Sequence, residues 1–117
     1  MKQLKNIKRK LEWEKYYNPD FDWYDWEFYA DNTLSEDFIR EFKNKVDWEF
    51  VSEYQELSEE FIREFKDKVD WYWISFRQIL SEDFIREFKD RVNWNMVLTH
   101  QKLSREFKNE YVIKFKL

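Results

Sequence analysis

Residues 34–56 read LSEDFIREFKNKVDWEFVSEYQE, and this stretch decides the fold because the chain repeats it. It returns at 57–79 as LSEEFIREFKDKVDWYWISFRQI and at 80–102 as LSEDFIREFKDRVNWNMVLTHQK. One tryptophan in each copy marks a period of 23 residues: Trp48, Trp71 and Trp94. A fixed period of this size is typical of proteins built from stacked structural repeats.

The first half of each copy predicts a short helix that begins at a serine: Ser35, Ser58 or Ser81. Serine is a strong N-cap, and the acidic pair after it suits the positive end of the helix dipole. Apolar residues fall on one side of this helix, in the first copy Phe38, Ile39, Phe42 and Val46. On the other side, acidic and basic residues four apart are expected to pair, at Glu36–Arg40, Glu41–Lys45, Glu59–Arg63, Glu64–Lys68, Glu82–Arg86 and Glu87–Arg91.

The second half of each copy predicts another short helix, capped at its start by Asp47, Asp70 or Asn93. A tryptophan, an aliphatic residue and a glutamine share one face of this helix, in the first copy Trp48, Val51 and Gln55. The glutamine is expected to satisfy backbone groups in the turn between helices, because no glycine is present to cap that turn.

The composition favours a folded, all-α chain. Of the 117 residues, 22% are aromatic, and disordered segments are poor in aromatic residues. The chain has no glycine and a single proline, so tight β-hairpin turns that need positive φ are nearly excluded. We therefore predict an all-α fold, a short α-solenoid of stacked helix-turn-helix repeats with atypical capping units. One domain is expected over 1–117, with full repeats at 34–56, 57–79 and 80–102, an N-terminal cap at 1–33 and a C-terminal cap at 103–117.

The predicted N-terminal cap combines two dissimilar segments. Met1–Lys15 is basic with apolar residues at helical spacing, so a short amphipathic capping helix is expected. Pro19 ends it and suits the start of a further helix. A membrane-surface or nucleic-acid element is the alternative for the first segment. The acidic, aromatic stretch that follows contains DWEFYA at 25–30, which matches DWEFVS at 47–52 with one residue fewer before the next leucine. It predicts half a repeat, with a docking motif as the alternative.

The predicted C-terminal cap begins with LSREFKNEY at Leu103. Phe107 and Tyr111 keep the aromatic positions of the serine-capped helix. Lys108 replaces the isoleucine and suits an outer face with no repeat after it. The last residues, VIKFKL, either extend this helix or fray.

The serine-capped helix is nearly identical in the three copies, whereas the second helix varies between its tryptophan and its glutamine. The varying positions lie roughly opposite the Trp–Gln face on a helical wheel, so they are expected to point away from the stack. Aromatic and arginine side chains among them are the usual anchors of protein interfaces. We therefore predict a partner-binding surface at Phe50, Tyr54, Tyr72, Trp73, Phe76, Arg77, Met96 and His100. The alternatives are that these residues pack on neighbouring helices or differ through drift.

The chain offers little for catalysis. His100 is the single histidine and there is no cysteine, which excludes a two-histidine metal site, a disulfide and a thiolate nucleophile. A chain without glycine has no glycine-rich phosphate loop. Most carboxylates lie beside Arg or Lys, as on a solvated helix face, and a glycosidase-like carboxylate pair is the catalytic alternative. We expect a protein that is not an enzyme and that uses no metal and no cofactor.

Charge and hydropathy narrow the class of partner. A net charge of −4 is mild for a protein that binds nucleic acid. No apolar run approaches the ~18 residues that span a bilayer, and the basic start lacks the apolar stretch of a secretory signal. We expect a cytoplasmic protein with a protein partner. The alternative is a nucleotide or a single-stranded nucleic acid that stacks on the aromatic rings and on arginines such as Arg63, Arg77 and Arg86.

The motif Asp-Trp-x-x-Ile-Ser-x-x-Gln-x-Leu-Ser-Glu-x-Phe-Ile-x-x-Phe, complete at 70–88, resembles α-helical repeats of about 23 residues in proteins of large DNA viruses, phages and some bacteria. The match runs from Asp25 to about Tyr111 and departs at Asn93, at Leu98 and in both caps. The resemblance implies an α-solenoid. The resemblance brings no activity with it, but a small, acidic, all-α protein with viral-type repeats looks like an inhibitor of a host protein, such as an anti-CRISPR protein or another counter-defence factor.

Overall fold

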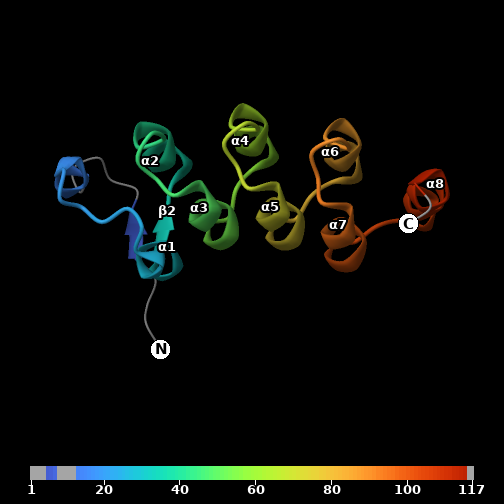
Figure 1. Ribbon diagram of the computed structural model, residues 1–117, viewed down its shortest axis with the longest axis horizontal. Helices are drawn as coiled ribbons and strands as arrows, with labels where there is room; N and C mark the ends of the chain where they lie inside the picture. The colour runs from blue at the N-terminus through green and yellow to red at the C-terminus, as the bar shows by residue number, and fades with distance from the viewer. Residues whose placement is uncertain (1–4, 8–12, 116–117) are drawn as a thin grey trace. The chain divides into compact units, whose positions relative to one another are not determined.

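The computed structural model describes residues 5–7 and 13–115, with side chains from 13 to 111, and it is predominantly helical (Figure 1). The helices are α1 (Trp26–Asp31), α2 (Glu36–Glu41), α3 (Trp48–Tyr54), α4 (Glu59–Glu64), α5 (Trp71–Arg77), α6 (Glu82–Glu87), α7 (Trp94–His100), α8 (Arg105–Phe115) and the 3-10 helix η2 (Glu14–Tyr17). Two short strands, β1 (Lys5–Ile7) and β2 (Asn32–Leu34), pair in parallel, with Lys5 opposite Asn32. Apart from this small pair of strands, the predicted all-α class is confirmed.

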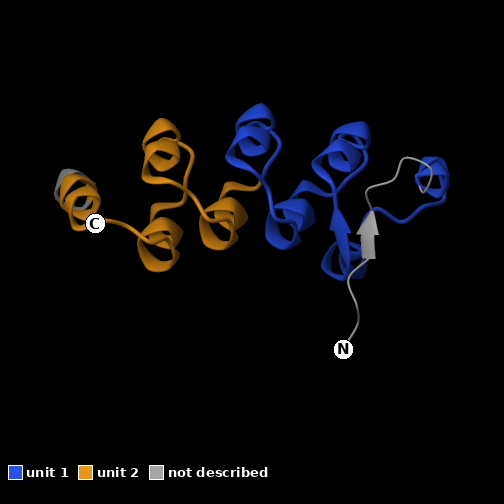
Figure 2. Ribbon diagram, turned by 180° about the vertical axis from the view of Figure 1, so that it is seen from behind, with its two compact units in different colours: residues 1–69 blue, residues 70–117 orange. Residues whose placement is uncertain are grey.

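The chain forms two compact units, residues 1–69 and residues 70–117 (Figure 2). In the first unit, α1 and α3 lie side by side in one layer, and α2 and α4 lie in a second layer (Figure 1). In the second unit, α5 and α7 lie side by side, and α6 lies in the other layer. Each unit therefore separates the serine-capped helices from the helices that vary in sequence.

The predicted helix starts are confirmed. The hydroxyls of Ser35, Ser58 and Ser81 each accept a hydrogen bond of 3.1 Å from the backbone N–H three residues later. The side-chain oxygens of Asp47 and Asn93 cap α3 and α7 in the same way, at 3.0 and 3.1 Å. These bonds satisfy N–H groups that cannot pair within the helix, so each short helix has a fixed first residue.

The apolar side of α2 is buried as the sequence predicts. Its residues are Phe38 and Ile39, both fully buried, with Phe42 and Val46 in the turn that follows. The corresponding phenylalanines and isoleucines of α4 and α6 are buried as well. Burial of such side chains stabilises a fold by about 1.5–3 kcal/mol each, so this layer holds most of the core.

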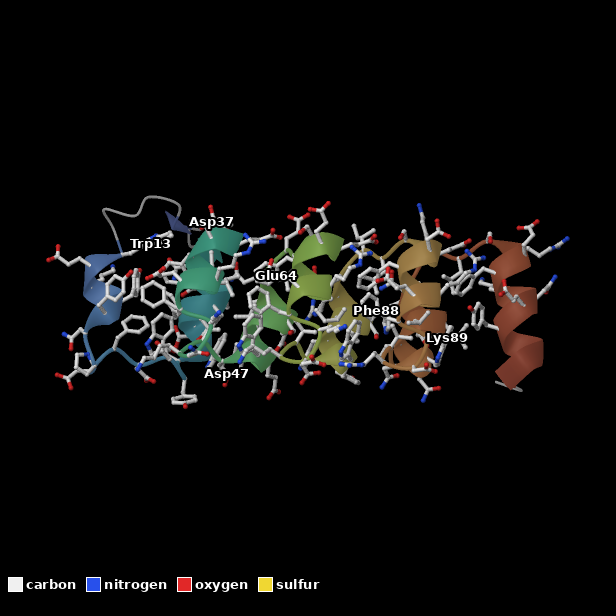
Figure 3. The ribbon with its side chains drawn as sticks, turned by 90° about the horizontal axis from the view of Figure 1, so that it is seen from above. Trp13, Asp37, Asp47, Glu64, Phe88 and Lys89 are labelled. Atoms are coloured by element: carbon white, nitrogen blue, oxygen red, sulfur yellow. The ribbon has the colours of Figure 1, made fainter. Side chains whose placement is uncertain are left out.

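The constant tryptophan is half-buried and joins neighbouring copies. The indole Nε1 of Trp48 donates to the Lys43 carbonyl oxygen at 2.9 Å, and its ring centroid lies 5.0 Å from that of Phe65 on the next copy. Trp94 donates in the same way to the carbonyl oxygen of Lys89, which follows α6 (Figure 3). Each indole thus ties its own turn to the following helix, which explains why this residue does not vary.

Gln55 and Gln101, which end α3 and α7, confirm the role in a turn that the sequence predicts for them. Gln55 Oε1 accepts from the Leu34 N–H at 2.8 Å, and Gln55 Nε2 donates to the carbonyl oxygens of Tyr29 and Asn32 at 2.7 and 2.9 Å. Gln101 makes the same three bonds, at 2.7 to 3.0 Å, to the turn before α6. One amide therefore satisfies three backbone groups of the turn that precedes the serine-capped helix of its own copy.

The ion pairs predicted at Glu36–Arg40 and Glu82–Arg86 are wrong. Glu36 instead accepts hydrogen bonds from the backbone N–H and the hydroxyl of Ser58, at 2.7 and 3.1 Å. Arg40 bridges Asp37 on its own helix and Glu64 on α4, at 3.0 Å each (Figure 3).

The second unit has the same arrangement: Glu82 accepts from Ser104 at 2.5 and 3.0 Å, and Arg86 bridges Asp83 and Glu110. The pairs that end in Lys45, Lys68 and Arg91 are not helical pairs, because α2, α4 and α6 end at Glu41, Glu64 and Glu87. Arg40 and Arg86 therefore each pair within their own helix, three residues apart, and also join it to the next serine-capped helix.

The predicted capping helix over Met1–Lys15 is wrong where the structure describes that segment. Residues 5–7 form β1, and η2 begins at Glu14; the rest of the segment before Trp13 lies outside the described residues. The helix expected after Pro19 is also absent from residues 18–25. The Asn18 side chain instead accepts a hydrogen bond from the Asp20 N–H at 2.9 Å, which closes a turn.

Aromatic rings cover α2 where a capping helix was expected. Trp13, Tyr16 and Trp23 are buried. The Tyr16 ring lies 5.0 Å from the Phe38 ring, edge to face, and the Trp23 ring lies 5.2 Å from the Phe42 ring. An edge-to-face contact such as that of Tyr16 with Phe38 adds about 0.5–1.5 kcal/mol beyond the burial of the rings. The buried rings of Trp13, Tyr16 and Trp23 therefore cover the end of the fold where a capping helix was expected.

The structure confirms the predicted aromatic positions of the C-terminal segment and the exposure of Lys108. Phe107 and Tyr111 are buried and their rings lie 6.3 and 4.9 Å from the ring of Trp94. Lys108 is exposed, as expected for an outer face. α8 continues to Phe115, the last residue that the structure describes, so residues 112–115 extend the helix.

Candidate partner-binding surface

Six of the predicted binding residues lie on α5 and α7 of the second unit, and we call this set the α5–α7 face: Tyr72, Trp73, Phe76, Arg77, Met96 and His100. Tyr72 is 43% exposed, and Arg77 and His100 are also exposed. Trp73, Phe76 and Met96 are half-buried. The prediction that these side chains point away from the core is confirmed for Tyr72, Arg77 and His100. The half-buried side chains of Trp73, Phe76 and Met96 lie at the edge of the core.

The rings of the α5–α7 face form one continuous cluster. The Phe76 ring on α5 lies 4.2 Å from the imidazole of His100 on α7, at an angle of 34°. Tyr72 and Trp73 lie 6.2 and 5.7 Å from Phe76. The cluster therefore spans two neighbouring helices, which is the arrangement of an interface anchor rather than of a single exposed ring.

Arg77 extends this cluster with a cation. Its guanidinium carbon lies 5.8 Å from the Trp73 ring centroid and 5.1 Å from the Phe76 ring centroid. Arg40 and Arg86 also lie over rings, but both are held by carboxylates. From Trp71 to Ser81 the chain has no acidic residue, so the charge of Arg77 is not neutralised within its own helix. A guanidinium stacked on rings keeps its N–H groups available at the edge of the plane.

The other two predicted residues, Phe50 and Tyr54, lie on α3 of the first unit. The Phe50 ring lies 5.5 Å from the Tyr29 ring of α1 and 6.4 Å from the Tyr54 ring. Phe50 is half-buried, so the alternative of packing on a neighbouring helix holds for this residue. The predicted surface is therefore divided between two units.

Trp26 lies on the surface, which the sequence match did not predict. The match of residues 25–30 to residues 47–52 pairs Trp26 with the half-buried Trp48 and so gives it the wrong structural role. α1 has six residues and α3 has seven, so the missing residue lies inside the helix and not after it. Trp23 takes the structural role: its ring lies 5.2 Å from that of Phe42, as the Trp48 ring lies 5.0 Å from that of Phe65. Trp26 is 52% exposed and occupies a varying position. The sequence signal for this difference was that the segment from Asp25 to Leu34 is one residue shorter than the segment from Asp47 to Leu57.

Tyr29 sets this register. Its hydroxyl accepts a hydrogen bond from the Asp47 N–H at 2.8 Å and donates to the Trp23 carbonyl oxygen at 2.7 Å. Ser75 accepts in the same way from the Asn93 N–H, also 18 residues later, at 2.9 Å. Burial raises the pKa of the fully buried Tyr29 phenol well above its usual value.

Leu98 departs from the motif at the position of Ser75. α7 is the last helix of its type among the described residues. At the same spacing, the N–H that a hydroxyl at position 98 would bind belongs to residue 116, which lies outside the described residues.

Residues 13–111 contain no group of three or more His, Asp or Glu placed to hold a metal ion. None of the helices in the described part of the chain is long and apolar enough to cross a membrane. No family model, no curated protein and no solved structure matches this chain. Function is therefore inferred from its own surfaces.

Proposed function

We propose that the chain is a short α-solenoid of stacked 23-residue repeats that acts without catalysis as a protein-binding module. The solenoid is supported by contacts that recur between copies: the Glu36–Ser58 and Glu82–Ser104 bonds, and the tryptophan rings on the next helix. In a solenoid each repeat contacts its neighbours, so a constant scaffold carries side chains that are free to vary.

The observation that carries the binding role is the α5–α7 face. Exposed Tyr72 and Arg77 adjoin the half-buried rings of Trp73 and Phe76, and His100 completes the cluster from α7. Rings whose inner edges are packed lose little side-chain entropy on binding, and Trp, Tyr and Arg are the residue types that contribute most to interface affinity. A protein partner with a complementary apolar pocket and an acceptor for Arg77 fits this face.

We place this activity in the cytoplasm and assign it to inhibition of a host protein. The resemblance of the repeats to those of viruses and phages supports the inhibitor role, in the manner of an anti-CRISPR or other counter-defence factor. In this proposal the protein covers a functional surface of its target and carries out no reaction.

A nucleotide or single-stranded nucleic acid is the second candidate ligand. Arg77 stacked on Trp73 and Phe76 favours it, because bases stack on aromatic and guanidinium planes. The carboxylates that hold Arg40 and Arg86 disfavour it, since they neutralise two other arginines that a phosphate backbone would need.

The test is affinity capture from the native host with the parent chain and with Phe76→Ala and Arg77→Ala. We expect a protein identified by mass spectrometry to bind the parent and to be lost with both variants, while their helical circular dichroism stays unchanged. Lys89→Ala, an exposed cation outside this face, is the matched control and should bind as the parent does. Equal capture by all four chains would refute the role of this face. A nuclease-sensitive, salt-sensitive ligand would identify the nucleic-acid alternative.

A further inference from the structure

A second surface, on α1 and α3 of the first unit, differs in charge from the α5–α7 face. We call it the α1–α3 face and define it by Trp26, Glu27, Glu49, Phe50, Glu53 and Tyr54. The chain has no Lys or Arg from Tyr16 to Ile39 or from Val46 to Ile62, so both helices and their flanking segments carry acidic side chains only. The segments 71–81 and 93–104, which include α5 and α7, contain no acidic residue, so the charged side chains there are basic only.

Large aromatic rings are exposed on the α1–α3 face. Trp26 is 52% exposed and Tyr54 is 38% exposed, and their ring centroids lie 6.3 Å apart at an angle of 31°. Tyr24, two residues before Trp26, is 77% exposed. Rings grouped in this way mark interaction surfaces, and the face of an aromatic ring attracts a cation.

A hollow of about 330 Å³ lies beside α1 and shares Glu27 with this face. Two rings and four carboxylates line it: Phe21, Phe28, Asp22, Asp25, Glu27 and Asp31. The two rings lie 5.1 Å apart, edge to face, and form the apolar wall. Asp22 and Asp25 each use Oδ1 to accept a backbone N–H, which fixes both carboxylates in place.

The chemistry of this hollow suits an organic cation better than a metal ion. No group of three carboxylates among residues 13–111 converges closely enough for a metal. Carboxylates spread around aromatic walls instead match a Lys or Arg side chain, whose apolar stem packs on rings while its head binds oxygen atoms. The same carboxylates repel phosphate groups, so an anionic ligand does not fit.

We propose that the α1–α3 face and the adjoining hollow dock a Lys- and Arg-rich segment of a partner protein. One basic side chain enters the hollow, and others lie over Trp26 and Tyr54 beside the carboxylates of Glu49 and Glu53. The partner is selected by charge complementarity, which speeds association and makes affinity depend on salt. This surface acts independently of the α5–α7 face and does not require its ligand.

The probe is a fluorescent ten-residue peptide of alternating Arg and Ser, titrated into the full chain beside a control peptide with Glu in place of Arg. We expect the Arg peptide to bind and the Glu peptide not to bind. Binding of the Arg peptide should weaken several-fold as NaCl rises from about 50 to about 300 mM, because exposed charges are screened. Equal binding of both peptides, or of neither, overturns the proposal.

Two variants test the residues themselves. We test the single variant Trp26→Ala and the double variant with Glu49→Gln and Glu53→Gln. Each should weaken binding of the Arg peptide about fivefold or more. Asn95 and Thr99 fill the positions of Glu49 and Glu53 in the third copy, so the double variant is expected to fold, which its melting curve checks. Phe76→Ala is the control and should bind the Arg peptide as the parent does. A folded double variant with parental affinity overturns this proposal and leaves the role of the α5–α7 face untouched.

Discussion

At the scale of single residues, buried polar atoms hold the turns of a chain that has no glycine. The amide of Gln55 binds three backbone groups, and the hydroxyl of Tyr29 binds two. A buried donor or acceptor left without a partner costs about 1–3 kcal/mol, so each of these side chains matters more than its size suggests. Tyr29 also sets the register that exposes Trp26.

Tyr29→Phe should lower the free energy of unfolding by about 1–3 kcal/mol at pH 8, because the Asp47 N–H and the Trp23 carbonyl oxygen lose their partner. The stability gap between parent and variant should close at higher pH. Burial raises the pKa of Tyr29 in the folded chain, whereas the unfolded chain ionises this phenol above pH ~10.

The folded state then binds more protons than the unfolded state, so the free energy of unfolding of the parent falls by up to about 1.4 kcal/mol per pH unit. The Tyr29→Phe variant has no phenol at this position, so its free energy of unfolding lacks this dependence on pH. Urea denaturation of both chains at pH 8, 10 and 11 measures the gap, and a gap that does not change with pH contradicts the burial of the phenol.

At the scale of elements, tryptophans with similar sequence surroundings serve opposite purposes. Trp48 donates a hydrogen bond to Lys43 and packs on Phe65, so it joins α3 to the next copy. Trp26 starts α1 at the corresponding sequence position but is 52% exposed. The difference follows from the shorter α1, which turns its first residue toward the varying face.

Trp48→Ala and Trp26→Ala therefore form a matched pair. We expect Trp48→Ala to destabilise the fold by about 2–4 kcal/mol, since a half-buried ring and its hydrogen bond are lost. Trp26→Ala should change the free energy of unfolding by less than about 1 kcal/mol. Thermal melting followed by circular dichroism compares them. Equal losses would show that Trp26 shares the structural role of Trp48.

Sequence reasoning succeeded where the deciding interaction is local. Ser35 and Asp47 cap their helices through bonds to N–H groups three residues away, and such bonds follow from residue type alone. It failed where distant partners compete. Glu36 lies four residues before Arg40, where an ion pair within the helix was predicted, but its carboxylate binds Ser58, 22 residues away. A helical wheel describes a single helix, so it does not show that neighbour. It also does not show where α1 is one residue shorter than α3.

At the scale of the whole molecule, scaffold and surface are carried by different residues. The serine-capped helices and the constant residues of the other helices supply the core and the contacts between copies, while the varying positions supply two exposed faces of different charge. One face has Arg77 on aromatic rings, and the other has Trp26 among carboxylates. A chain of this kind changes its ligand by changing a few side chains without a change in its core.

A solenoid should tolerate an added repeat. We expect a chain with a second copy of residues 57–79 inserted after Ile79 to fold, with more helical circular dichroism and a melting temperature no lower than that of the parent. Nearest-neighbour contacts explain this result, because the new copy provides both halves of each glutamate–serine and tryptophan contact. An aggregated product, or one with no gain in helical signal, would contradict the solenoid.

The division between scaffold and surface is tested most directly by an exchange within α5. Tyr72→Asn, Trp73→Met, Phe76→Thr and Arg77→His together give α5 the varying residues of α7 while its constant residues stay. We predict that the melting temperature of the exchanged chain stays within a few degrees of that of the parent, which corresponds to about 1 kcal/mol in the free energy of unfolding. We also predict that capture of the proposed host protein is lost. Unchanged capture, or an unfolded chain, would contradict the account.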